Sequence, residues 1–389
     1  MTTRPVRDAL VVEGDPDRIP WLFSASFLIF IVITPIWGSA VQRSPRRIVP
    51  ASLHVCALGS LVFALFARFD IGREVTPYAF YIWAAVYNQF IVSVFWSLLV
   101  DLIGPGTART LYGPISAGGT IGAFGGPLLT KLLVHHIDVS GVMVLPVLFL
   151  ELAVVGIIAI RRTGKQLERE PAQRELAERD DAPLPENAWA GITKTAKSRY
   201  LSALAAFTLL TAIAATFVYY TQANVVKHAF PDKVAKTAYF ATLEFWQQLA
   251  TFVAQLVIAP LLLRRIGPGP VLVLLPVLQL AGLVGYWITP SLPLIAAIHI
   301  SSRTVALGLT RPARELCFTV ISRDDKYRAK NVIDTLMYRF GDFISAWMFF
   351  AVGIGAALIT ISSVLTAGWI ALAISLGVGF RRRVKESTA

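Results

Sequence analysis

Long apolar segments alternate with short charged loops along the whole chain. The segments cover approximately residues 21–42, 49–68, 77–103, 112–134, 141–160, 201–223, 237–263, 270–289, 291–310, 331–354 and 357–380. Each is close to the length of roughly 20 residues that a helix needs to cross the hydrocarbon core of a bilayer. The pattern therefore predicts an all-α polytopic membrane protein with about eleven transmembrane helices.

Composition and charge agree with this pattern. Of the 389 residues, 55% are hydrophobic and only 15% are charged, so a soluble domain could not bury the apolar surface. The formal net charge of +12 comes largely from basic clusters at the ends of the apolar segments. Such clusters are typical of cytoplasmic loops and not of a nucleic-acid-binding surface. We therefore expect a multi-pass protein of the cell inner membrane with a cytoplasmic C-terminus, and no nucleic-acid partner.

A polar stretch separates five predicted helices from six. Residues 161–200 contain REPAQRELAERDDAPLPEN and are interpreted as a cytoplasmic linker between an N-terminal bundle, residues 1–160, and a C-terminal bundle, residues 201–389. The basic loop from Gly38 to Arg47 also echoes the loop from Leu263 to Gly269, which follows the second span of the C-terminal half. This weak internal repeat predicts that the first half lacks its opening helix.

The stretch from residue 303 to residue 342 contains a predicted helix with one polar stripe. Its polar residues recur at intervals of three and four, so they share a helical face. Ionisable groups that face lipid would cost roughly 2.5 to 3.5 kcal/mol each on insertion scales, so this stripe should face protein or a wet cavity. The alternative is that its charged residues only pair with neighbouring helices as packing contacts. The stripe residues that we expect to contact a substrate are Asn331, Asp334, Tyr338 and Arg339.

Other predicted helices carry further polar candidates. Arg303 lies inside an apolar segment, and guanidinium groups bind phosphate and carboxylate in bidentate geometry, so this residue indicates an anionic substrate. Glu244 and Gln248 share a helical face, and a carboxylate within a membrane helix is a candidate proton or substrate switch. A structural carboxylate that pairs with a basic residue across the bundle is an equally open interpretation. The N-terminal half contributes Asn88 and Trp96 as binding candidates.

Two features are expected to be structural. Arg311 and Arg314 lie a turn apart at the end of their segment, where basic side chains anchor a helix at the membrane interface. Gly118, Gly122 and Gly126 are spaced by four and share one face, which predicts close helix packing. A phosphate-binding loop is excluded in this glycine-rich run, because it contains no Gly-Lys-Ser/Thr sequence and no strand is predicted before it.

The loop after the first predicted span carries a recognisable motif. Gly38 is followed by Arg43 and then by the pair Arg46 and Arg47. This arrangement resembles the signature loop of the major facilitator superfamily, although Gln42 stands where that loop has an acidic residue. The resemblance implies two six-helix bundles around a central cavity. It also implies that this chain begins at the second helix of the usual twelve.

Two longer segments carry a narrower resemblance. The matching residues of the first segment are Phe95, Trp96, Asp101, Arg109, Tyr112, Gly118, Gly119 and Gly122. Those of the second segment are Arg314, Glu315, Lys326, Lys330, Ile333, Asp334, Arg339 and Gly341. Together they resemble the ATP/ADP translocase family, the nucleotide transporters of plastids and intracellular bacteria, which is a branch of the facilitator fold. The N-terminal sequence Arg7-Asp8-Ala9-Leu10 is similar to the end of that family's first helix.

These observations predict a secondary active transporter that works by alternating access and moves a small anionic, nucleotide-like or phosphorylated solute. Two alternatives are open: a non-transporting membrane receptor or scaffold, and a facilitator-type carrier of a non-anionic solute such as a drug or peptide. The sequence contains no catalytic triad, metal-ligand cluster or cofactor motif, so we expect neither an enzyme nor a cofactor or metal. We expect a monomer in the lipid bilayer.

Overall fold

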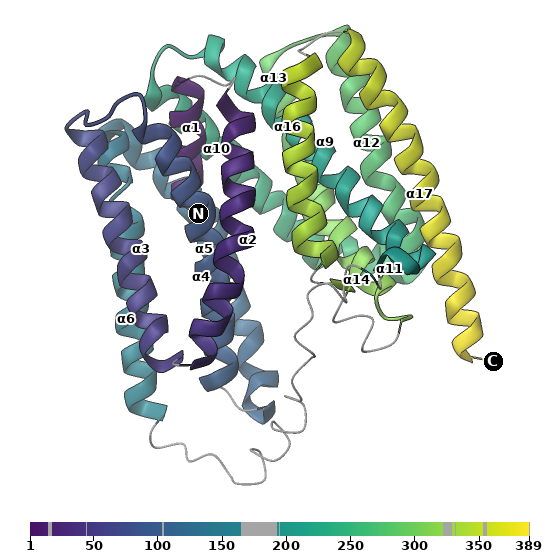
Figure 1. The fold of residues 1–389 in the computed structure, drawn as a ribbon, viewed down its shortest axis with the longest axis horizontal. Helices are drawn as coiled ribbons and strands as arrows, with labels where there is room; N and C mark the ends of the chain where they lie inside the picture. Colours follow the sequence, from purple (N-terminus) through teal and green to yellow (C-terminus); the bar gives the residue numbers. More distant parts are fainter. Residues whose placement is uncertain are drawn as a thin grey trace. The chain divides into compact units, whose positions relative to one another are not determined.

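The computed structural model describes residues 1–14, 18–43, 45–102, 105–164, 193, 195–321, 329–330, 332–352 and 356–388. The regular elements in this part of the chain are all helices, as Figure 1 shows along the coloured chain. The predicted all-α class is therefore confirmed.

The helices keep the order of the predicted segments. Those of the N-terminal half are α1 (Thr3–Glu13), α2 (Ile19–Arg43), α3 (Pro45–Arg68), α4 (Thr76–Leu102), α5 (Pro105–Val142) and α6 (Leu145–Gly164). Those of the C-terminal half are α9 (Arg199–Ala229), α10 (Lys233–Val253), α11 (Ala259–Ile266), α12 (Pro268–Ile288), α13 (Leu292–Val305), α14 (Arg311–Cys317), α16 (Tyr338–Val352) and α17 (Ala356–Thr388). Three π-helical segments interrupt the second group: η2 (Ala254–Ile258), η3 (Ala306–Thr310) and η4 (Val332–Met337).

Each of the eleven predicted apolar segments overlaps a described helix or a run of helices. By length and composition, six helices or continuous runs in the described part of the chain can cross a membrane. A seventh crossing results if residues 118–142 and 145–159, which are bent by 81° relative to each other, form one broken span. The count of eleven spans stays a prediction, because several of the other segments contain residues outside the described part.

The chain folds into two compact units. The first unit comprises Met1–Asp15, Ser24–Glu186 and Pro231–Thr242, and the second comprises Pro16–Phe23, Asn187–Phe230 and Leu243–Ala389. The predicted linker at residues 161–200 stays a prediction, because the description of that stretch is nearly confined to its ends.

The first unit packs its helices around two apolar clusters. Leu53 and Ala57 of α3 lie against Leu150 and Val154 of α6, with Tyr87 of α4 in the same cluster. The short helix α1 is too short to cross a bilayer, yet seven of its eleven residues are buried. It packs mainly against α4, so the N-terminal residues form part of the core of this unit.

The second unit is built around α9, which contacts α13, α16 and α17. Phe207 of α9 packs against Trp369 of α17 with ring centroids 5.6 Å apart, and both side chains are fully buried. Two glycines allow α12 and α17 to meet closely, since a Cβ on Gly269 would lie 2.8 Å from the Cα of Gly377. Small residues at such contacts let apolar helices pack by van der Waals contact, which is the main source of helix association in a bilayer.

Local sequence explains where α11 ends and α12 begins. Gly267 adopts a φ of 74°, a left-handed conformation that glycine enters without steric cost, and it caps the end of α11. Pro268 follows at the first position of α12, where its missing N–H is not needed for a helical hydrogen bond. This Gly-Pro pair makes a sharp boundary between two membrane helices.

Candidate functional site

The strongest candidate site is a group of charged and polar side chains in the second unit. We call it the central charge cluster, and its members are Glu244, His299, Arg303, Tyr338, Arg339 and Asp342. They come from α10, α13 and α16, three helices that are otherwise largely apolar. Because lipid cannot solvate such groups, they must satisfy one another or face a wet path.

Arg303 connects the helices of this cluster. Its Nη1 atom donates a hydrogen bond to the hydroxyl oxygen of Tyr338, at 3.3 Å, and thereby joins α13 to the first residue of α16. The guanidinium also interacts electrostatically with the carboxylates of Glu244 and Asp342. A guanidinium has five donors, so the bond to Tyr338 leaves capacity for an anionic group.

Asp342 is held from two sides. The hydroxyl of Thr216 on α9 donates a hydrogen bond to its Oδ1 atom at 3.1 Å, and both side chains are buried. Arg339, one helical turn earlier, places Nη1 3.7 Å from Oδ2 of Asp342. Gly341 makes this arrangement possible, because a Cβ there would lie 2.7 Å from the Cβ of Ala212 on α9.

Glu244 comes from α10 and interacts electrostatically with Arg303. The Nε2 atom of Gln248 donates to its Oε1 atom at 3.2 Å, which confirms that the two residues share a helical face. His299 on α13 interacts electrostatically with both Glu244 and Arg303. The His299 side chain is buried, and its Nδ1 atom has no hydrogen-bond partner in the described part of the chain.

A small cavity adjoins the cluster within the second unit. It has a volume of about 20 Å³ and is lined by residues that include Gln279, His299, Ser302, Arg303 and Trp369. The hydroxyl of Ser302 donates to Oε1 of Gln279 at 3.0 Å, so one wall of this cavity is polar. A cavity needs about 10–15 Å³ to admit a water molecule, so this space can hold water but not a solute.

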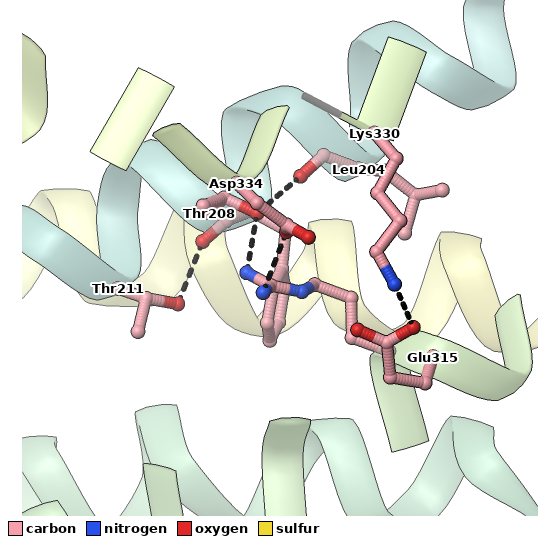
Figure 2. Close-up of polar contacts among 8 residues, drawn as sticks. Leu204, Thr208, Thr211, Glu315, Lys330 and Asp334 are labelled. Carbon is pink, nitrogen blue, oxygen red and sulfur yellow. Dashed lines mark hydrogen bonds and ion pairs between the residues drawn. The ribbon is translucent and has the colours of Figure 1, made fainter. Parts of the chain in front are cut away.

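A second group of charges lies where α14 meets η4, and we call it the helix-end cluster. Its members are Thr208, Arg314, Glu315, Lys330 and Asp334. Nη2 of Arg314 lies 2.7 Å from Oδ1 of Asp334, and Nη1 donates to the hydroxyl of Thr208 at 2.9 Å. Lys330 pairs with Glu315 beside it, as Figure 2 shows. Two ion pairs therefore join α14 to Lys330, which precedes η4, and to Asp334, which lies within η4.

The structure brings together five of the nine predicted binding residues. Those in or beside the central charge cluster are Glu244, Gln248, Arg303, Tyr338 and Arg339. Asp334 instead belongs to the helix-end cluster, where Arg314 is its ion-pair partner. Arg339 pairs with Asp342 and not with Asp334, because a separation of five residues turns two helical side chains apart.

The other predicted residues lie elsewhere. Asn88 belongs to the first unit and donates from Nδ2 to the carbonyl oxygen of Ala84, at 2.6 Å, within its own helix. Trp96 lies on α4, but its side chain is outside the described part of the structure. Asn331 lies outside the described residues altogether. The binding roles of these three residues stay predictions.

Arg314, His299 and Thr216 make contacts in these two clusters but are not among the predicted site residues. Arg314 was expected to anchor its helix at the interface, but its side chain is 13% exposed and is held by Asp334 and Thr208. His299 could have been found, because it precedes Arg303 by four residues and therefore shares its helical face. Thr216 could not have been found in this way, because nothing in the sequence of α9 marks one threonine as the partner of Asp342.

The expected glycine packing face is present only in part. A Cβ added to Gly118 or Gly122 would meet nothing within 4 Å, so these glycines do not bring another described residue close. Gly126 differs, because a Cβ there would lie 3.1 Å from Met1 and Thr2. The N-terminal residues, and not a neighbouring long helix, occupy this close contact.

Comparisons with known proteins agree with the helical architecture. A family model described as Major Facilitator Superfamily matches residues 10–318. The crystal structure of the nucleoside transporter NupG is similar, with 14% identity, a TM-score of 0.64 and coverage of 99% of this chain and 94% of that chain. No curated protein matches this chain.

Two further solved structures show the same fold. A bacterial homologue of the iron transporter ferroportin, in an inward-facing state, has 13% identity and a TM-score of 0.63, covering 97% of this chain and 95% of that chain. A bacterial homologue of the human lysosomal transporter Spinster has 13% identity and a TM-score of 0.54, covering 98% and 93%. At these identities, the likeness concerns the fold and not the substrate.

Proposed function

The chain belongs to the Major Facilitator Superfamily, and we propose that it is a secondary active transporter that moves a small anionic solute by alternating access. Family membership identifies a membrane transporter and not an enzyme. The anionic substrate is our inference from the central charge cluster. The observation that carries it is Arg303, a partly buried arginine within a membrane helix that is oriented by Tyr338 from another helix.

Arginine suits this role for geometric reasons. Its planar guanidinium binds carboxylate and phosphate groups through two parallel hydrogen bonds, and it keeps its charge under all physiological conditions. Arg303 cannot simply extend to the interface as a lysine or arginine near a helix end does, because it lies well inside the Leu292–Cys317 span. Arg339, in the facing helix, provides a second positive group for the same anion.

The carboxylates of the cluster compete with an anionic solute for the arginine side chains. The carboxylates of Glu244 and Asp342 balance the guanidinium groups of Arg303 and Arg339, so the cluster is close to neutral when no solute is bound. An incoming anion must therefore compete with them for the guanidinium donors. We propose that the anionic group of the solute replaces Glu244 at Arg303, while Asp342 is retained by Thr216 and Arg339.

A nucleotide-like or phosphorylated solute is the narrower form of the proposal. Phosphate oxygens match guanidinium donors well, and the two segments that resemble the ATP/ADP translocase family contain Arg314, Asp334 and Arg339. The nucleoside transporter with the same fold is compatible with such a solute, although the likeness itself concerns the fold. Sugar phosphates meet the same chemical requirement and belong in the same test.

Ligand-induced stabilisation of the purified protein tests the proposal. We expect AMP, glucose 6-phosphate or another phosphorylated compound in a panel of nucleotides, sugar phosphates and peptides to raise the unfolding temperature of the wild type. Arg303→Ala and Arg339→Ala should each abolish this rise, because a hydrogen bond to a charged group contributes about 1.5 to 3 kcal/mol. That loss corresponds to at least about a tenfold weaker affinity.

A matched arginine provides the control. Arg382 is 82% exposed near the end of α17, where it pairs with Glu386, so Arg382→Ala should keep the full ligand response. Arg303→Lys keeps the charge but not the bidentate geometry, and we expect it to respond weakly. If both Arg303→Ala and Arg339→Ala respond like the wild type, these arginines are structural. A response to peptides alone would favour a carrier of non-anionic solutes.

A further inference from the structure

A histidine–carboxylate pair joins two helices of the first unit. Nδ1 of His54 on α3 lies 2.9 Å from Oε1 of Glu151 on α6, and the two side chains are 54% and 45% exposed. Neither side chain makes a further hydrogen bond or ion pair in the described part of the chain. The pair therefore has no lysine or arginine to balance the carboxylate there.

The surroundings of the pair are apolar. Leu53 and Leu150, which precede the two residues in sequence, are buried in the cluster between α3 and α6. Val55 and Leu152, which follow them, are 59% and 65% exposed. The pair thus lies at the edge of an apolar contact between two membrane helices, and Glu151 is the only carboxylate of α6.

The helices packed against α3 are α4, α5 and α6. Cys56 and Tyr87 are the titratable side chains that share the apolar cluster beside the pair, and both are buried within it. No described lysine or arginine of these helices forms an ion pair with Glu151. Among the side chains that the structure describes, the imidazole of His54 is consequently the group that can neutralise this carboxylate.

The charge of the pair depends on one proton. An ionised carboxylate only accepts hydrogen bonds, so when Glu151 is ionised the hydrogen between the two residues belongs to Nδ1 of His54. With Nε2 unprotonated, the imidazole is neutral and the pair carries one negative charge. A proton on Nε2 creates an imidazolium that balances the carboxylate. A balanced pair is far less costly than a single charge in a medium that solvates charge poorly.

Glu244 differs in this respect. Its electrostatic partner is Arg303, whose positive charge is permanent, so Glu244 is balanced without taking up a proton. With no solute bound, therefore, the pair of His54 and Glu151 needs a proton in order to become neutral, whereas Glu244 does not.

We propose that His54 and Glu151 form the proton-binding site of a proton-coupled carrier, with the proton bound at Nε2 of His54 when the solute crosses. This inference rests on the proposed transport of an anionic solute. The proton is taken from the aqueous side from which the anion enters and is released on the other side, so no bond other than N–H is formed or broken. The co-transported proton offsets the negative charge of the solute against the membrane potential.

Proteoliposomes that contain the full chain separate coupling from binding. Radiolabelled inorganic phosphate, glucose 6-phosphate and AMP serve as probes in two assays: exchange across liposomes without a pH gradient, and accumulation driven by an inward proton gradient. We expect His54→Gln and Glu151→Gln to lower the ratio of accumulation to exchange at least tenfold. Glutamine keeps a hydrogen-bonding group at each position, so the contact between α3 and α6 can persist.

Three further variants serve as two controls and one rescue of the pair. Glu386→Gln removes the carboxylate of an exposed pair on α17 and should leave the ratio unchanged. Glu244→Gln alters the solute site and not the pair, so it should change both assays in the same direction and leave their ratio unchanged. The double variant H54E/E151H restores the pair with exchanged positions and should recover part of the accumulation.

Each outcome decides between explanations. Exchange without any gradient-driven accumulation by the wild type would overturn the proton site and leave the anion function intact. Failure of the wild type to move any of the three probes in either assay would refute the anion function, and the coupling proposal would fall with it. A parallel loss of exchange and accumulation in His54→Gln and Glu151→Gln, together with a lower unfolding temperature, would identify the pair as a packing contact only.

Discussion

Gly341 controls the distance between α16 and α9 beside the central charge cluster. A Cβ at this position would lie 2.7 Å from the Cβ of Ala212 and 2.8 Å from the carbonyl oxygen of Leu209. Ordinary contact begins near 3.4 Å, so Gly341→Ala should move the helices apart by roughly 0.7 Å. The hydrogen bond from Thr216 to Asp342 would then lengthen from 3.1 Å to about 3.8 Å, beyond hydrogen-bonding distance.

The magnitude follows from these contacts. Overpacking of a tight core typically costs about 1 to 3 kcal/mol. Loss of the hydrogen bond to a buried carboxylate adds about 1.5 to 3 kcal/mol, less what helix relaxation recovers. We therefore expect Gly341→Ala to lower the unfolding temperature in detergent, measured by intrinsic tryptophan fluorescence, and to reduce the stabilisation by phosphorylated ligands.

Two variants make this prediction decisive. Gly285→Ala places the same methyl group in α12 of the same unit, where nothing lies within 4 Å, and it measures the effect of alanine on helix propensity alone. Ala212→Gly in the Gly341→Ala background should restore part of the stability, because it removes one of the two short contacts. The reasoning is refuted if Gly341→Ala unfolds at the same temperature as Gly285→Ala and keeps the full ligand response.

Two further predictions concern topology and the helix-end cluster. A cysteine introduced at Ser387 should react with an impermeant reagent only after the cells are opened, since the basic clusters predict a cytoplasmic C-terminus. The native Cys56 and Cys317 are buried, which keeps the background labelling low. Labelling of intact cells would contradict the predicted topology. Replacing Arg314 or Asp334 alone by leucine should lower the free energy of unfolding by about 3 kcal/mol, because the remaining charge loses its partner in a largely buried position. The double leucine variant should lower it by less than the sum of the two single losses. Strictly additive losses in the unfolding free energy would show that the two residues are not coupled.

Much of the local architecture could be predicted from the sequence. The length and hydropathy of a segment are local properties, and a chain in lipid must satisfy its backbone hydrogen bonds within each helix, so apolar segments of spanning length became helices. Contacts within one helix follow from its fixed period. The hydrogen bond between Gln248 and Glu244 joins residues four apart, and the ion pair between Arg339 and Asp342 joins residues three apart.

The partners of the charged residues were decided by the tertiary structure. Arg303 and Tyr338 are separated by 35 positions, and Thr216 and Asp342 by 126. Helical periodicity states which residues share a face, but it does not state which other helix that face will meet. That choice depends on small residues such as Gly341, whose missing side chain lets one particular neighbour approach.

The same reason explains the pair that sequence reasoning did not find. His54 and Glu151 are 97 positions apart on two apolar helices, and neither belongs to a polar stripe in its own segment. The sequence by itself determined that each would lie within a membrane helix. Only the packing of α3 against α6, through apolar residues such as Leu53 and Leu150, placed an imidazole within hydrogen-bonding distance of a carboxylate. Helix formation is set by short-range backbone and solvation energies, whereas the pairing of buried charges depends on contacts that exist only after the helices have packed.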